Sequence, residues 1–202
     1  MSALPKAEMT VFETILARRS VRNYQARGID MATIRTLQEA AARAPTAIHQ
    51  EPWGFVVIQD RQLLRKLSDQ AKPLFLAEVR QHANEHAKHL LDTFDKPDFN
   101  IFYDAGTLIL ICGKTSASFY IADCWLAAEN LMLAACAMDL GTCVIGSALP
   151  VLNMPEVKTE LKIPDDFSVV APIILGYPSE KTAPSARKSS VILASFPSVK
   201  EN

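Results

Sequence analysis

The chain has 202 residues, 49% of them apolar, and its 22 acidic and 21 basic side chains leave a net charge of −1. This length suits one domain or one protomer of an entwined dimer, and the apolar residues can fill a sizeable core. A nearly balanced charge excludes a protein whose whole surface attracts nucleic acid or membranes, so a basic binding site has to be local. We expect residues 1–202 to form a single domain.

The cysteines and the apolar segments indicate a cytoplasmic protein. The four cysteines stand in apolar surroundings without C-x-x-C spacing: Cys112, Cys124, Cys136 and Cys143. We interpret them as buried small hydrophobic residues in a reducing compartment. The N-terminus lacks the basic and apolar regions of a secretory signal. Residues 120–140 are strongly apolar but include Asp123 and Glu129, so they make a poor membrane span.

The first third of the chain predicts two helices and a strand. A helix over residues 8–18 places Val11, Ile15 and Leu16 on one face and ends at the basic pair Arg18-Arg19. Asp30 is expected to cap a second helix over residues 31–44, which Pro45 stops. The apolar stripe of this helix is Ile34, Leu37, Ala41 and Ala44. Residues 53–59 are short, β-branched and aromatic, which favours a strand.

The middle of the chain predicts helix, an irregular stretch and a second strand. Asp60 opens a helix with leucines at 63, 64 and 67. Residues 71–100 are more polar, and we expect them to be helical to about Thr93 and irregular around Pro97. Residues 107–112 form a buried strand.

The last third begins with a helix over residues 117–139 that is apolar almost all round, which indicates a central helix or one packed at a subunit interface. Gly141 is expected to cap its C-terminus. A short strand over 143–145 ends at Gly146, and a small helix over 152–161 follows. The last strand covers 168–175, before a tail rich in Ser, Lys and Pro. Since the elements do not alternate regularly, and the glycine-rich Rossmann and P-loop signatures are absent, we expect an α+β fold.

Four segments carry residues suited to binding an anionic ligand with a flat polar ring. In the run Arg18-Arg19-Ser20-Val21-Arg22, guanidinium forks and a hydroxyl match phosphate oxygens, although a basic run can also be a solvated face. The loop 44–53 offers polar groups to a ring, or simply connects a helix to a strand. The glycines of residues 140–147 permit close backbone approach to a ligand. Arg187-Lys188 alone is surface charge.

The order and spacing of these segments resemble the FMN-dependent nitroreductase family. The similarity lies in Arg-x-Ser-x-Arg at 18–22, Ala-Pro-Thr-Ala and Pro-Trp within 44–53, and the apolar helix that runs into Gly-Thr-Cys-Val-Ile-Gly at 141–146. The strand over 172–178, followed by Arg187-Lys188, completes the pattern. The resemblance covers about residues 9–190, of which residues 68–100 match poorly.

The resemblance implies roles for individual residues. Arg18 and Ser20 would contact the FMN phosphate and ribityl chain, with Arg19 holding the same region. Arg22 would reach the N1/O2 edge of the isoalloxazine, where reduced flavin carries negative charge. The backbone N–H of Gly146 would point at flavin N5. The remaining residues assigned to the FMN site are Pro45, Thr46, Ala47, His49, Val144, Ile145, Arg187 and Lys188.

The family's fold and activity follow as expectations. The resemblance implies a central mixed or antiparallel sheet flanked by helices, in an entwined homodimer with FMN at the subunit interface. The expected reaction is ping-pong hydride transfer from NADH or NADPH, through FMN, to an electron-poor small molecule such as a nitroaromatic or quinone. Alternatives are another flavin reaction on the same fold (reductive dehalogenation, enoate reduction or flavin degradation) and a flavin-binding protein without turnover.

Some residues depart from the family pattern or admit a second interpretation. His49 and Glu51 stand where the family often has Asn and Gln, and Asp104-Ala105-Gly106 stands where it often has Ala-Pro. The spacing of His82, His86 and His89 permits a metal site on one helix face, but their polar surroundings favour a solvated helix, and we expect no metal. Several aromatic residues either cover the flavin's exposed face or pack in the core: Phe75, Phe94, Phe99, Phe102 and Tyr103.

Overall fold

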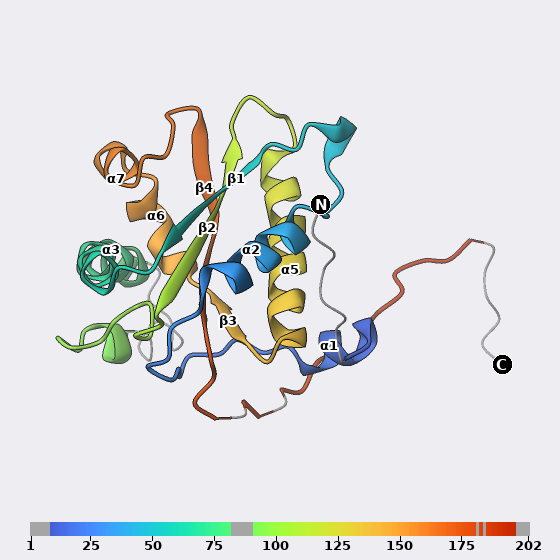
Figure 1. Cartoon of the computed structure of the whole chain (residues 1–202), viewed down its shortest axis with the longest axis horizontal. Coiled ribbons are helices and arrows are strands. Elements are labelled where there is room, and N and C mark those ends of the chain that lie inside the picture. Colours follow the sequence, from blue (N-terminus) through green and yellow to red (C-terminus); the bar gives the residue numbers. More distant parts are fainter. Residues whose placement is uncertain (1–8, 82–90, 181, 184, 197–202) are drawn as a thin grey trace.

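A four-stranded antiparallel sheet with helices on both faces forms the centre of the molecule (Figure 1). The computed structural model describes residues 9–81, 91–180, 182–183 and 185–196. The strands are β1 (Trp53–Ile58), β2 (Thr107–Lys114), β3 (Gly141–Val144) and β4 (Phe167–Gly176), in the order β1-β2-β4-β3. The expected α+β arrangement with a central antiparallel sheet is confirmed.

The two faces of the sheet carry separate apolar cores, because strand side chains alternate between faces. On β2, Leu108 and Leu110 contribute to one core, while Ile109 and Ile111 contribute to the other. The first core packs against α3 (Arg61–Gln81), α6 (Leu149–Leu152) and α7 (Pro155–Glu160). The second packs against α2 (Met31–Ala41) and α5 (Tyr120–Ala137). Burial on both faces explains why β2 is a continuous apolar run rather than an alternating one.

The N-terminal helix α1 (Val11–Ala17) begins at a capping box formed by Thr10 and Glu13. The helix lies beside the C-terminal end of α5 (Figure 1). The expected apolar face is present but is not buried within the chain: Val11 is 68% exposed, Ile15 52% and Leu16 73%. The prediction of the helix is therefore confirmed, whereas its apolar face has no covering layer among the described residues.

The end of α5 differs from the expectation. Gly141 is the first residue of β3 rather than a helix cap. Asp139 takes the left-handed conformation instead, with φ of 58°, and the N–H of Leu140 donates a 2.9 Å hydrogen bond to the carbonyl of Ala135. This is the Schellman pattern, with an aspartate where glycine is usual. The glycine is needed two residues later, at the start of β3, where it admits a neighbouring segment.

The expected helix over 152–161 is not continuous. Two short helices, α6 and α7, take its place, and Pro155 occupies the first position of α7. Proline suits that position because its missing N–H would be unpaired there anyway. The other elements agree with the expectation apart from their ends. Residues 91–94 are helical, and the stretch 82–90, including His82, His86 and His89, lies outside the described residues.

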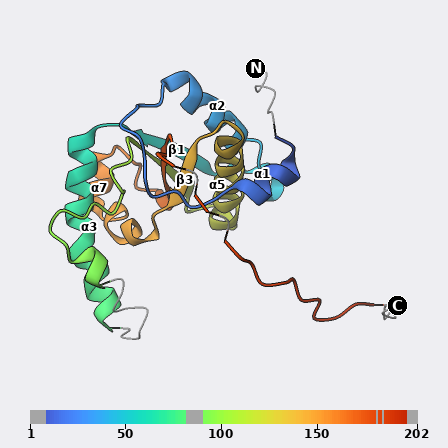
Figure 2. The same cartoon turned by 90° about the horizontal axis from the view of Figure 1, so that it is seen from below.

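The tail leaves the body of the protein after β4. Figure 2 shows the chain beyond this strand running away from the sheet and its helices. Its apolar residues are almost fully exposed: Val191, Ile192, Leu193 and Phe196. None of the described helices is both long enough and apolar enough to cross a bilayer.

Candidate functional site

The segment from Arg18 to Arg22 runs alongside β3 and forms the centre of the candidate site. Ser20 pairs with Thr142 in a parallel bridge, and the N–H of Val21 donates a 2.9 Å hydrogen bond to the carbonyl of Thr142. A Cβ at Gly141 would lie 2.7 Å from Cβ of Val21. No side chain tolerates such a distance, so the glycine allows this close approach. The two sequence segments predicted to bind one ligand are thus adjacent in the fold.

Arg18 and Arg19 differ in what their guanidinium groups do. Arg19 donates from Nη1 to the carbonyls of Leu16 (2.6 Å) and Arg18 (2.7 Å), which satisfies backbone groups at the end of α1. Its buried Nε has no partner among the described residues. Arg18 instead forms an ion pair with Glu129 on α5, with 3.9 Å between Nε and Oε1. Arg18 is therefore the more available cation, and Arg19 first stabilises the local backbone.

A cavity of about 590 Å³ opens beside these arginines. Its lining includes Arg18, Arg19, Cys136, Gly141, Thr142 and Pro178. This volume falls in the range of small-molecule and cofactor sites. The end of α1, the start of β3 and the chain leaving β4 therefore enclose a hollow whose wall carries two arginines, together with the acidic residues Asp139 and Glu180.

Arg22 lies farther along the segment, near two tyrosines and a thiol. Its Cζ is 5.8 Å from the centroid of the Tyr103 ring. Burial raises the pKa of the Cys143 thiol, and the nearby Arg22 and Ser20 only partly oppose that rise. Burial likewise raises the pKa of Tyr24, whose hydroxyl donates a 2.6 Å hydrogen bond to the carbonyl of Val21. Cys143 is therefore a neutral packed thiol at neutral pH, as expected from the sequence.

Open space follows the end of β3. Val144 is half-buried and Ile145 is buried, and the chain then turns into the short helix η2 (Gly146–Ala148). No described atom lies within 4 Å of the position that a Cβ would take at Gly146. A flat ring could approach the backbone here without meeting a side chain of the same chain.

The loop that follows α2 lies elsewhere in the protomer. Asp123, in the first turn of α5, accepts a 3.2 Å hydrogen bond from the N–H of Ala47. Pro45, Thr46 and His49 belong to the same loop, which includes the helix η1 (Ala47–His49). Ser20 pairs with Thr142 in β3, and β3 follows the other end of α5 (Figure 1). Because a helix rises about 1.5 Å per residue, the two segments are separated by roughly 20 Å along α5.

Arg187 and Lys188 are exposed residues of the tail, which runs away from the sheet and its helices (Figure 2). The aromatic residues of the middle segment mostly pack in the core, with Phe94 and Phe102 buried. Tyr103 is the one of the five that also contacts a candidate site residue. Sequence reasoning named Tyr103 only as one of five aromatic residues and did not predict its contact with Arg22, and it missed Glu129, because neither contact is local in sequence. Within the described residues, no group of three metal-binding side chains comes together.

The fold and this site define an α+β protein with a cavity, lined in part by two arginines, at the β3 edge of an antiparallel sheet. The sequence model of the Nitroreductase family matches residues 15–177, which places the chain in that family. The chain is therefore an oxidoreductase of the nitroreductase type.

Relatives and solved structures agree with this assignment. A Methanothermobacter thermautotrophicus protein, provisionally named an NADH dehydrogenase/NAD(P)H nitroreductase, is 28% identical over 86% of this chain and 80% of its own. A Bacteroides fragilis nitroreductase with bound FMN has a TM-score of 0.73 and 28% identity, covering 94% and 98% of the two chains. Iodotyrosine deiodinase bound to FMN and 3-iodo-L-tyrosine has a TM-score of 0.76 at 19% identity, covering 93% and 100%, and shares the fold.

Proposed function

We propose that this chain is an FMN-dependent oxidoreductase that transfers hydride equivalents from NADH or NADPH to an electron-poor small molecule such as a nitroaromatic or quinone. The observation that carries the proposal is the pairing of Ser20 with Thr142, which places the Arg18–Arg22 segment against β3. This pairing sets the segment beside the cavity that Arg18 and Arg19 line, and β3 leads on to the open backbone at Gly146. FMN has the matching parts, because a dianionic phosphate and a flat ring are linked by a ribityl chain.

The residues present fit the phosphate end of FMN. Arg18 supplies a guanidinium at a cavity large enough for part of a cofactor, and Ser20, which pairs with the cavity residue Thr142, supplies a hydroxyl beside it. The buried Nε of Arg19 is a donor without a partner among the described residues, so a bound anion would satisfy it. We assign the phosphate and the adjoining ribityl oxygens to these three residues.

The ring end of the proposed site lies toward Arg22 and Gly146. Bound FMN supplies the hydride chemistry, while the protein supplies binding, orientation and electrostatics. Arg22 places a positive charge beside the N1/O2 edge, where reduction leaves negative charge. Val144, Ile145 and Gly146 present backbone to the ring, with the N–H of Gly146 toward N5. A side chain at 146 would occupy the space that the ring needs.

A homodimer would unite the separated segments. The loop containing Pro45, Thr46, Ala47 and His49 is about 20 Å from Ser20 along α5, so the two segments lie at opposite ends of that helix within one protomer. A second copy placed against α5 would supply that loop, and its tail would supply Arg187 and Lys188. The exposed apolar faces agree with such burial. They include Phe12 and Leu16 on α1, and Phe119, Ile121, Trp125 and Leu126 at the start of α5.

The visible spectrum of the purified protein, before and after anaerobic NADH or NADPH, tests the proposed function. We expect flavin absorbance that one or both nucleotides bleach, and that a nitroaromatic or quinone restores. Halogenated aromatics and enoates in the same panel separate the alternative reactions. A flavin that neither nucleotide bleaches would indicate a binding protein without turnover. A colourless protein that takes up no added FMN would overturn the proposal.

A further inference from the structure

Tyr103 has a backbone conformation that is unusual for its residue type, at a contact with Arg22. Its φ is 52°, and the next residue, Asp104, follows with φ of 53°. Two consecutive residues with side chains in the left-handed region are strained, and they persist only where their surroundings fix them. The strain turns the chain so that the Tyr103 ring lies under the Arg22 guanidinium, 5.8 Å from Cζ to the ring centroid.

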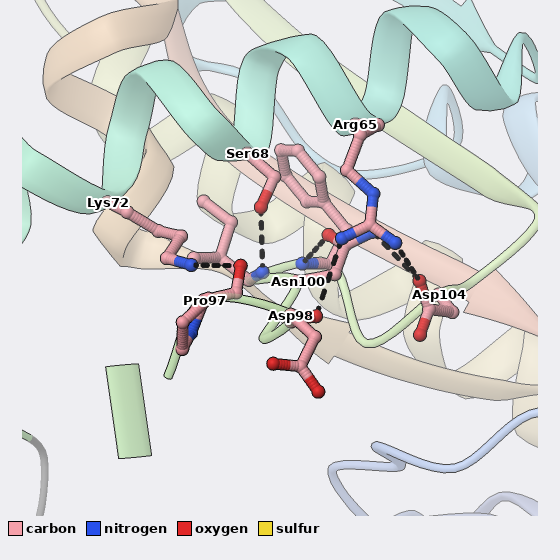
Figure 3. A network of polar contacts seen from close by, with 9 residues as sticks. Arg65, Ser68, Lys72, Pro97, Asp98, Asn100 and Asp104 are labelled. Atoms are coloured by element: carbon pink, nitrogen blue, oxygen red, sulfur yellow. Dashed lines mark hydrogen bonds and ion pairs between the residues drawn. The ribbon is translucent and has the colours of Figure 1, made fainter. Parts of the chain in front are cut away.

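The surroundings that fix this turn come from one face of α3 (Figure 3). Arg65 donates from Nη1 to the carbonyl of Asp98 at 3.4 Å, and its Nη2 lies 3.8 Å from Oδ1 of Asp104. One turn along, the hydroxyl of Ser68 accepts a 3.0 Å hydrogen bond from the N–H of Ile101. At the next turn, Lys72 donates 2.8 Å and 3.3 Å hydrogen bonds to the carbonyls of residues 96 and 97. We call these three side chains the α3 clamp.

The loop between residues 96 and 104 is also braced from within. Asn100 donates from Nδ2 to Oδ1 of Asp104 at 3.0 Å and accepts a 2.9 Å hydrogen bond from the N–H of Phe102. Ile101 and Phe102 are fully buried, so the loop is anchored in the core immediately before Tyr103. The strained turn is therefore held in place by the α3 clamp, by the hydrogen bonds of Asn100 and by the burial of Ile101 and Phe102.

The ring of Tyr103 is held on a second side by the aromatic side chains of the same region. Phe99 meets it edge to face, with centroids 5.4 Å apart and planes at 89°. Phe94 and Phe75 continue the row of ring contacts at 4.8 Å and 4.6 Å. Edge-to-face contact is a favourable geometry for aromatic pairs. The Tyr103 ring therefore has little freedom to move away from Arg22.

We propose that Tyr103 is a positioning residue, held by the α3 clamp, which keeps the Arg22 guanidinium at the ring edge of bound FMN. The proposal rests on the proposed function, which places that ring edge at Arg22. A cation over an aromatic face is attracted to it, and the long arginine side chain otherwise samples many rotamers. A charge fixed in advance stabilises developing negative charge more than a mobile one does. The contact with Tyr103 thus favours reduced over oxidised FMN.

The midpoint potential of protein-bound FMN tests this inference, measured by anaerobic titration against a reference dye. Tyr103→Leu should lower the preference for reduced over oxidised FMN about tenfold, or about 30 mV for a two-electron couple. Tyr103→Phe keeps the ring and should shift the potential less in the same direction. Arg65→Met acts through the clamp alone and should give a smaller shift of the same sign. Arg22→Ala removes the charge itself and should give the largest shift of the potential in the same direction.

A second arginine–tyrosine pair supplies the matched control. Arg27 lies 4.0 Å from the Tyr177 ring centroid, so Tyr177→Leu removes a similar contact outside the proposed site and should leave the potential unchanged. A potential that Arg22→Ala shifts and Tyr103→Leu does not would overturn the inference alone. A wild-type protein that takes up no FMN would instead overturn the proposed function. If Tyr103→Leu does not fold, as judged by thermal unfolding, Tyr103→Phe and Arg65→Met carry the same test.

Discussion

The guanidinium of Arg18 and the carboxylate of Glu129 form an ion pair that joins the end of α1 to the middle of α5. The arginine side chain is 21% exposed and the glutamate side chain 51%, so both can still meet a ligand. The same guanidinium is the proposed partner of the FMN phosphate. Glu129 therefore competes with the phosphate for Arg18 and adds a negative charge close to a dianion.

Glu129→Gln should tighten FMN binding because it removes that competitor. An exposed ion pair is worth about 0.2 to 1 kcal/mol, which corresponds to an increase in affinity of up to about fivefold. Fluorescence quenching on titration of FMN into apoprotein measures the effect. Glu160→Gln is the control, since it breaks an ion pair with Lys66 and lies outside the site. Weaker binding in Glu129→Gln would contradict the assignment of Arg18 to the phosphate.

Substitutions in the two halves of the Arg18–Arg22 segment should affect different quantities: FMN affinity in the first half and the rate of flavin reduction in the second. Arg18→Ala combined with Ser20→Ala removes phosphate contacts, and we expect FMN affinity to fall at least a hundredfold, since hydrogen bonds to charged groups contribute about 1.5 to 3 kcal/mol each. Arg22→Ala should slow flavin reduction by NADH or NADPH more than it weakens binding. Stopped-flow absorbance and equilibrium titration give the two quantities. The reverse pattern would contradict both assignments.

Gly141→Ala should disturb the site through the backbone. The added Cβ would lie 2.7 to 2.8 Å from three atoms of Val21, between Ser20 and Arg22. Such overpacking costs about 1 to 3 kcal/mol, and it pushes the Arg18–Arg22 segment away from β3. We expect a lower melting temperature together with weaker FMN binding. Gly106→Ala is the control, because no described atom lies within 4 Å of its Cβ position, and it should change neither quantity.

The buried thiols should make the protein less stable in alkali. Burial raises the pKa of both Cys112 and Cys124 to about 12, from an ordinary value near 9. Between these values the unfolded chain loses the thiol protons and the folded chain retains them. Below pH 9 these thiols therefore do not change the free energy of unfolding. As the pH rises from 9 toward 12, the free energy of unfolding falls by about 1.4 kcal/mol per pH unit for each thiol. Urea unfolding at pH 8 and pH 10 checks this, and Cys112→Ala should flatten the dependence.

The proposed homodimer should depend on the exposed face of α1. Leu16→Glu places a charge on a side chain that is 73% exposed in the protomer, and we expect it to shift the protein toward monomer in sedimentation analysis. FMN should be lost together with the dimer if each site needs both copies. Leu74→Glu changes an exposed leucine on α3 and should leave the assembly intact. A Leu16→Glu protein that remains dimeric would exclude α1 from the interface.

Local patterns were sufficient to predict most elements of the fold. Asp30 caps α2 as expected, because its short carboxylate can satisfy a free N–H at the start of the helix. Continuous apolar runs predicted β2 and β4, since strands buried on both faces have no polar alternation. Gly141 shows where local reasoning failed. Its position after a helix suggested a helix cap. The glycine is instead required because Val21, which is far away in sequence, packs directly against its backbone.

The Arg18-Arg19-Ser20 run was recognisable from sequence as one of four ordered segments, because residue type and order are local properties. Only the tertiary structure showed that the two arginines of this run have different partners. Arg19 bonds the backbone of α1, and Arg18 pairs with Glu129 from a distant helix. The loop at Ala47 belongs to the opposite end of α5. The sequence by itself thus determined the family and predicted the chemistry of the site. Only the fold decided which residues meet, because contacts between distant segments depend on how the sheet and helices pack.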